Sequence, residues 1–303
     1  MNTNTRATSV TVPPPDVATP PLEPVVARPD GASPGDDRSV RRRTLRRLVG
    51  LLPSTALVVL CLVIWEVWVR VGDVPSYLLV PPSEVAALIW TEWGSFAPDV
   101  RSTVTEAFLG LLFGTAFGVV LAVAIVHSQP ISRAIFPLII GSQVVPKVAI
   151  APLLILWLGA GTMPKIVVAM LMAFFPVVMN HAFGLRSVPD DMIDLGRSLK
   201  ASTFKIFYRI RFPYSLPALF TGIKLASALA IIGAVVGEFI AASSGLGYRI
   251  VFANQNLDSK TMLASVVLLV GVGIVFFACI AALERLVAPW AKTSQTTTGG
   301  MTA

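Results

Sequence analysis

The sequence predicts an all-α membrane protein with six transmembrane helices, and two observations carry that prediction. Of the 303 residues, 54% are hydrophobic and only 14% are charged, and the mean hydropathy is +0.75. A soluble domain usually carries about 25% charged residues. The few charges are also clustered, which leaves long uncharged stretches that suit lipid rather than water.

Six stretches are each close to the roughly 20 residues that a helix needs to cross ~30 Å of hydrocarbon. The third contains Pro137, Pro146 and Pro152, so we expect it to be kinked or broken. The shorter stretch 82–93 is predicted to form an amphipathic helix outside the membrane or at its surface. The predicted spans are 50–70, 104–126, 131–158, 164–184, 215–240 and 262–283.

Three regions follow from this pattern. Residues 1–47 are rich in proline and polar residues and end in five arginines, which predicts a disordered tail with a basic juxtamembrane end. Residues 48–290 form the six-helix domain, and 291–303 a disordered C-terminal tail. With the N-terminus inside, the inner segments hold fourteen basic residues and the outer segments five. Both termini are therefore expected in the cytoplasm.

Charge and motif content exclude several functions. The net charge is +7, but the basic residues fall between apolar stretches, where they act as topology signals, so no nucleic-acid partner is predicted. The sequence has no G-x-x-x-x-G-K-[ST] phosphate loop, and GAGTMPK at 159–165 has the wrong spacing. We therefore expect no enzymatic site, no metal site and no cofactor bound by this chain.

Small residues recur at helical spacing in two of the spans. Gly110, Gly114 and Gly118 share one face of the second span, and Gly233 and Gly237 share one face of the fifth. Glycines four residues apart let helix backbones approach closely in lipid. Packing within the chain is the favoured explanation, and a dimer seam is the alternative.

The cytoplasmic stretch 186–217 is the most informative part of the sequence, because long helix connections are usually functional. Pro189 followed by two aspartates is a good helix start, since proline fits the first turn and acids suit the positive end of the helix dipole. Met192, Leu195 and Leu199 then recur at i, i+3 and i+7, which gives one apolar face.

A second short run, from Phe204 to Ile210, follows the break at 201–203 and is expected to end at Pro213. Two readings stay open for this pair of short helices. They cap the bundle, or they present an apolar knob to a cytoplasmic partner. The interleaved aromatic and basic residues also suit contact with anionic lipid headgroups.

This stretch resembles the EAA loop of binding-protein-dependent ABC importer permeases, which runs Glu-Ala-Ala, then Gly, then Ile-x-Leu-Pro. The spacing is kept throughout, although only the isoleucine and the proline are identical. Aspartate replaces the glutamate with a shorter arm, and lysine stands at the glycine, which matters if that turn needs a positive φ. The matching residues are Asp194, Leu195, Gly196, Lys200, Ile210, Phe212 and Pro213.

The resemblance covers roughly 50–290. It extends to VPPSEVAAL, PKVAIAPLLILWLGAG, PKIVVAMLMAFFPVVMN and GEFIAASSGLGYRI. Together these are similar to the sulfonate, taurine and nitrate branch of the family, which includes pyrimidine-precursor and riboflavin uptake permeases. The resemblance implies the type I, MetI-like permease fold and a small organic or anionic solute.

The same resemblance implies the partners. These are two ATP-binding subunits that carry ATP and Mg²⁺, an extracytoplasmic solute-binding protein, a second permease copy that forms a homodimer, and lipid of the bacterial cytoplasmic membrane. It also implies that the loop 186–213 couples the permease to the ATPase. The coupling residues would be Met192, Ile193, Asp194, Leu195, Gly196, Arg197, Ser198, Leu199, Lys200, Ala201, Ser202 and Pro213.

Lys147, Pro146 and Glu238 are candidates for the translocation pathway. Lys147 is expected near the middle of the proline-interrupted span, where a charge is costly and usually faces a cavity. Alternatively it snorkels or pairs with a helix carbonyl. Glu238 would close the outer side of the fifth span, or it is a plain interface residue.

Two other functions remain open from the residues alone. An ion-gradient-driven secondary transporter would usually show internal repeats and more ionisable residues at mid-membrane. A non-transport membrane scaffold is the second alternative.

Overall fold

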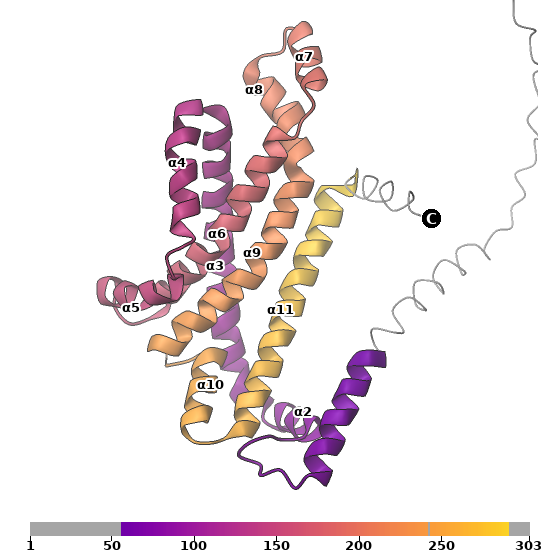
Figure 1. Ribbon diagram of the computed structural model, residues 1–303, viewed down its shortest axis with the longest axis vertical. Helices are drawn as coiled ribbons and strands as arrows, with labels where there is room; N and C mark the ends of the chain where they lie inside the picture. Colours follow the sequence, from indigo (N-terminus) through magenta and orange to yellow (C-terminus); the bar gives the residue numbers. More distant parts are fainter. Residues whose placement is uncertain (1–55, 242, 291–303) are drawn as a thin grey trace, which may run out of the picture. The chain divides into compact units, whose positions relative to one another are not determined.

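The computed structural model describes residues 56–241 and 243–290, and their regular structure is helical throughout. The predicted tails, 1–47 and 291–303, lie outside the described residues. The compact unit begins at Val59, and the contacts discussed below lie within it. A helix over 56–71 is followed by α2 (Pro82–Thr91), α3 (Trp93–His127), α4 (Gln129–Ser142), α5 (Lys147–Leu158), α6 (Thr162–Arg186), α7 (Asp190–Ser198), α8 (Thr203–Ile206), the π-helix η1 (Phe207–Arg211), α9 (Phe212–Ala241), α10 (Leu246–Gln255) and α11 (Ser259–Val287) (Figure 1).

The predicted spans agree with the helices that the structure describes. Within the described residues, four helices are long and apolar enough to cross a membrane, namely α3, α6, the continuous rod Thr203–Ile240, and α11. A fifth span results if the bent pair α4–α5 counts as one. The first predicted span, 50–70, corresponds to the helix over 56–71, and its first residues lie outside the described part. A total of six spans is compatible with this arrangement.

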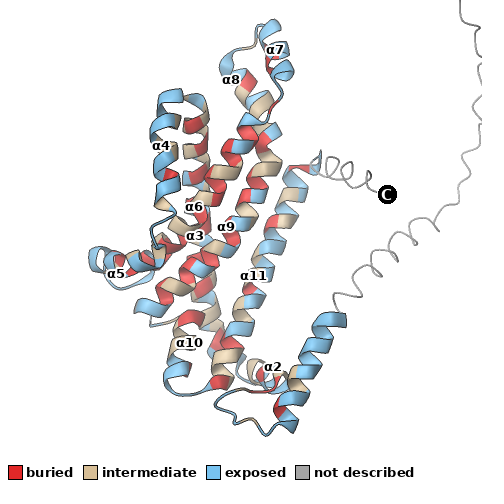
Figure 2. Ribbon diagram, viewed as in Figure 1, coloured by how far each residue is buried: buried red, intermediate tan, exposed pale blue. Residues whose placement is uncertain are grey.

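Helix α6 is the centre of the bundle and packs against both α3 and α9. The close approach depends on glycines, since a Cβ on Gly110 would lie 2.3 Å from that of Ala169, and one on Gly233 would lie 2.6 Å from the Cα of Ala169. The glycine faces therefore serve packing within the chain, as favoured above. Burial is concentrated on α6 and α9, whereas α11 is mostly exposed (Figure 2).

The third predicted span is broken, as its prolines indicated. Helices α4 and α5 meet at an angle of 97° across residues 143–146. Pro146 precedes the first residue of α5 with an extended backbone, because a proline cannot continue the hydrogen bonding of the preceding helix. In Figure 1 the short helix α5 turns away from the direction of α4.

The stretch expected outside the membrane forms α2, which has ten residues and is too short to span. Pro82 starts the helix, where the missing N–H costs nothing. Glu84 in its first turn pairs with Lys260 at the start of α11, 3.4 Å away.

Candidate functional site

The helix expected at the start of the cytoplasmic stretch is present. Helix α7 begins at Asp190, directly after Pro189, and both aspartates lie in its first turn. We call residues 187–211, which include α7, α8 and the π-helix, the α7–α8 segment. It projects beyond the ends of α4 and α11 (Figure 1).

One face of α7 is anchored inside the segment. Ile193 is buried together with Val188 and Ile206 in a small apolar cluster. Gly196 is also buried, and a Cβ added there would meet Ile206 Cγ1 at 3.2 Å and Ile210 Cδ1 at 3.3 Å. This contact ties α7 to the rod that continues into the membrane.

The other apolar face of α7 is exposed. Met192, Leu195 and Leu199, which the spacing placed on one face, are 45%, 62% and 74% exposed. Phe204 and Tyr208, in the second short run, are also exposed, by 76% and 63%, and their rings stack on each other. Large apolar side chains gathered on one exposed surface mark an interaction site. This exposure favours the knob over the cap.

Backbone and side-chain hydrogen bonds fix the turn between α7 and α8, where Lys200, Ala201 and Ser202 of the predicted coupling loop lie. Lys200 has φ +53°, and its N–H donates to the carbonyl of Arg197 while that of Ala201 donates to the carbonyl of Gly196. These two bonds form a Schellman motif, whose turn residue is usually glycine. Ser202 then accepts the N–H of Lys205 and caps α8. The turn that the lysine occupies does therefore require a positive φ.

Side chains on the exposed surface of α7 add local contacts. Asp194 pairs with Arg197 at 3.1 Å, with both side chains about two-thirds exposed. Ser198 Oγ donates to the carbonyl of Asp194 at 2.9 Å.

The expectation that Pro213 ends the second short helix was wrong. The chain stays helical from Thr203 through Pro213 into α9. A π-turn over Phe207–Arg211 precedes the proline, and the N–H of Phe212 donates to the carbonyl of Phe207. The wider turn relieves the clash and the lost hydrogen bond that proline imposes on an α-helix.

Lys147 lies at the bend between α4 and α5. It is the first residue of α5, directly after the exposed Pro146, and its side chain is partly buried. Its Nζ donates to Gln143 Oε1 and lies 5.8 Å from the centre of the Phe175 ring. The predicted interruption of this span therefore falls directly beside Lys147, since the 97° break between α4 and α5 precedes it.

Glu238 lies at the opposite end of the bundle from α7 and is 1% exposed. It accepts hydrogen bonds from Thr103 Oγ1 and from the N–H of Gly247, both at 2.6 Å. Thr103 Oγ1 also accepts the N–H of Leu246, and Asp99 accepts the N–H of Gly245, both at 2.9 Å. Side chains of α3 and α9 thus satisfy the N–H groups at the start of α10.

A buried ion pair accompanies these bonds. Lys165 in α6 pairs with Glu106 in α3, and their side chains are 6% and 1% exposed. Lys165 is one of the five basic residues that the charge pattern assigns to the outer segments. No local signal connects it to a glutamate that lies 59 positions earlier in the chain.

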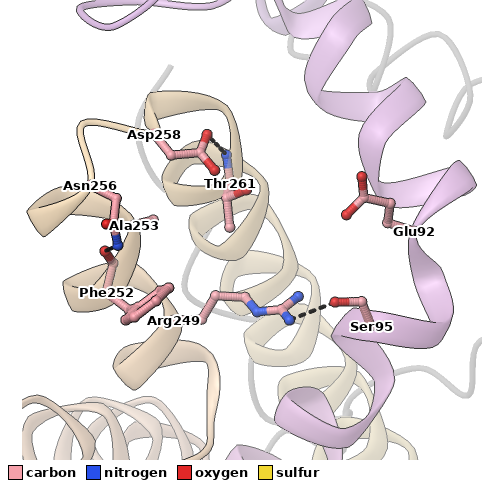
Figure 3. Close-up of a pocket in the computed structure, with 8 residues that line it drawn as sticks. All are labelled: Glu92, Ser95, Arg249, Phe252, Ala253, Asn256, Asp258 and Thr261. Carbon is pink, nitrogen blue, oxygen red and sulfur yellow. Dashed lines mark hydrogen bonds between the residues drawn. The ribbon is translucent and has the colours of Figure 1, made fainter.

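A pocket opens beside this network, between the start of α3, α10 and the start of α11 (Figure 3). Arg249 crosses it, donates to Ser95 Oγ at 2.7 Å, pairs with Asp99 at 2.9 Å, and lies 4.3 Å from the centre of the Phe96 ring. Burial alone would raise the pKa of Asp258, but hydrogen bonds from Thr261 outweigh it and hold that pKa below its usual value. Glu92 and Asp258 place two carboxyl groups at the rim of the pocket, which Arg249 crosses.

Comparison with known proteins identifies the chain. Residues 114–293 match the family described as "Binding-protein-dependent transport system inner membrane component". The chain belongs to this family. It is 34% identical to a probable ABC transporter permease protein of Haemophilus influenzae, over 76% of this chain and 94% of that one.

Two further relatives are 32% identical to this permease. One is the formylaminopyrimidine transport permease ThiX of Halalkalibacterium halodurans, with 82% of this chain and 99% of that one covered. The other is the riboflavin transport system permease RibX of Chloroflexus aurantiacus, with 83% and 95% covered. The permease is thus a transport subunit of an ABC importer, which removes the secondary transporter and the scaffold as alternatives.

The fold has a counterpart among solved structures. The inward-facing MetNI methionine ABC transporter contains a chain that matches with a TM-score of 0.58 at 18% identity, over 66% of this permease and 98% of that chain. The MetI-like fold expected from the sequence is therefore confirmed.

Proposed function

We propose that this permease imports its solute across the bacterial cytoplasmic membrane by docking the α7–α8 segment into an ATPase subunit. The observation that carries the proposal is the exposed surface of Met192, Leu195 and Leu199 on a helix that Ile193 anchors from behind. Each large apolar side chain gains about 1.5–3 kcal/mol when a partner buries it. A groove on a partner subunit would supply that burial.

The proposed assembly contains two copies of the permease, two ATP-binding subunits and an extracytoplasmic solute-binding protein. ATP and Mg²⁺ belong to the ATPase subunits, and the family description supports the binding protein. The excess of basic residues on the α7 side supports a cytoplasmic position for the α7–α8 segment and both termini. The binding protein would then approach the end of the bundle that carries α10.

The solute is proposed to be a small organic molecule rich in carbonyl groups. Two relatives at 32% identity are named for formylaminopyrimidine and riboflavin, whereas relatives named for aliphatic sulfonates and taurine are 28% and 27% identical. A ring with polar carbonyl groups is therefore favoured over a sulfonate.

Lys147 and Pro146 are proposed to line the translocation pathway at the α4–α5 bend. The ammonium group and the positive end of the α5 dipole both favour a carbonyl oxygen or an anion there. Lys147→Met should lower uptake while the complex still assembles, and Lys260→Met at the outer surface is the matched control. Unchanged uptake in Lys147→Met would refute the pathway role. Glu238 is proposed to close the outer side without touching solute.

Reconstitution tests the docking. The permease, the ATPase and the binding protein are assembled in proteoliposomes, and uptake and ATPase association are measured for Leu195→Asp and Leu199→Asp. A charge in an apolar groove should weaken association and uptake by at least about tenfold. Asp191→Asn on the same helix is the control. Wild-type uptake in both leucine variants, or uptake without any ATPase subunit, would contradict the proposal.

A further inference from the structure

The rod that joins the α7–α8 segment to the membrane contains an irregular turn. Between α8 and α9, residues Phe207–Arg211 form a π-helix, and the N–H of Phe212 donates to the carbonyl of Phe207. Phe207 and Phe212 thus mark the two ends of the turn. Such turns are rare, occur as single interruptions of α-helices and are frequent at functional sites.

Both histidines of the chain contact this turn. The ring of His127, the last residue of α3, meets that of Phe207 edge-on with 5.3 Å between the ring centres. The ring of His181, in α6, meets that of Phe212 edge-on with 6.0 Å between the centres. Both contacts have the geometry of favourable edge-to-face pairs. Each end of the π-turn is therefore held by a different helix.

The two contacts differ in their surroundings. His181 is fully buried, and neither of its ring nitrogens has a hydrogen-bond partner. Its ring therefore serves as a packing surface. His127 is exposed, and a cavity of about 210 Å³ lies beside it between the end of α3 and the α7–α8 segment. The His127 contact therefore borders an open cavity, whereas the His181 contact is buried.

We propose that His127 and His181 are positioning residues of a joint that passes movement of the α7–α8 segment to α3, α6 and α9. The joint rests on the proposed function, because an ATPase subunit supplies the movement. The movement would pass from α7 to the rod Thr203–Ile240 through the contacts that Ile193 and Gly196 make with Ile206. The His181 contact holds the base of α9, and Phe207 moves against His127 beside the cavity.

The test measures how many solute molecules are imported per ATP hydrolysed in proteoliposomes that contain the full complex. His127→Ala should lower this ratio by about two- to tenfold, the factor that an edge-to-face contact is worth, while basal ATP hydrolysis and assembly stay unchanged. His127→Phe keeps an edge-to-face partner without ring nitrogens and should restore the ratio. Gln129→Ala, which loses only a surface bond to Arg133, is the matched control.

Two further variants keep the proposal open to refutation. Phe207→Leu removes the same contact from the other side and should reproduce the drop even if His127→Ala fails to assemble. His181→Phe should assemble and couple like the wild type, because no hydrogen bond is lost.

A wild-type ratio in both His127→Ala and Phe207→Leu would overturn the joint. So would a loss in His127→Phe as large as that in His127→Ala, or a loss of coupling in His181→Phe. Failure of the wild-type complex itself to link ATP hydrolysis to uptake would instead contradict the proposed function.

Discussion

The two ends of the bundle differ in which kind of side chain they bury and which kind they expose. At the end that carries α10, charged and polar side chains are buried and form hydrogen bonds or ion pairs. Glu238, for example, accepts hydrogen bonds from Thr103 Oγ1 and from the backbone N–H of Gly247. At the α7 end, apolar side chains are exposed, and an ion pair on α7, between Asp194 and Arg197, is also exposed. A buried polar network is stable only when its members are paired. An exposed apolar surface gains from a partner.

This difference indicates that contacts within the permease stabilise the α10 end, whereas the α7 end gains stability from contact with another subunit. The network at the α10 end joins α3, α6, α9 and α10 through side chains and backbone groups of the permease itself. Substitutions there should act on the stability of the isolated permease. Substitutions on the outer surface of α7 should act on the assembled transporter instead.

The largest effect is expected for the buried pair of Lys165 and Glu106. Lys165→Met leaves the buried Glu106 without its cationic partner, which should lower the free energy of unfolding by about 3–5 kcal/mol. Thermal unfolding in detergent measures it. The double variant Lys165→Met with Glu106→Gln should recover most of the loss. Arg197→Met removes the exposed pair on α7 and should change the free energy of unfolding by less than about 1 kcal/mol. Equal losses of unfolding free energy in Lys165→Met and Arg197→Met would contradict the difference between the two ends.

A smaller effect is expected at Gly245, which precedes α10. Its φ of +118° disfavours any side chain, and a Cβ would lie 2.1 Å from Glu238 Oε1. Gly245→Ala should lower the free energy of unfolding by about 2–4 kcal/mol through backbone strain and overpacking.

Gly141→Ala in α4 is the matched control. No heavy atom lies within 4 Å of the added Cβ, so the helix should gain up to about 1 kcal/mol from the better propensity of alanine. A tolerated Gly245→Ala would mean that the start of α10 is not fixed against Glu238.

The features that depend on neighbouring residues, such as helix starts and breaks, could be predicted from the sequence. The start of α7 follows from Pro189 and the two aspartates after it, and the break between α4 and α5 follows from Pro146. Both are local preferences of the backbone. The apolar face of α7 also follows from spacing alone, although its exposure to solvent does not.

Sequence reasoning missed what depends on distant partners. Thr103 and Glu238 are 135 positions apart, and Lys224 pairs at 2.5 Å with Glu284, which lies 60 positions further along. The π-turn was missed for a different reason. Pro213 is a helix breaker by local rules, whereas the rod continues through it because the wider π-turn over Phe207–Arg211 precedes the proline.

The smallest effect is expected at Lys200, the turn residue after α7. Its φ of +53° lies in the left-handed region, which costs a residue with a Cβ about 1 kcal/mol and costs glycine almost nothing. Lys200→Gly should therefore stabilise the α7–α8 segment by about 1 kcal/mol, seen as slower amide hydrogen exchange over 190–206 and no change at the α10 end. Lys200→Ala should give no such gain, and Lys205→Gly inside α8 should speed exchange. If glycine and alanine at position 200 behave alike, the positive φ is not what limits the stability of the segment.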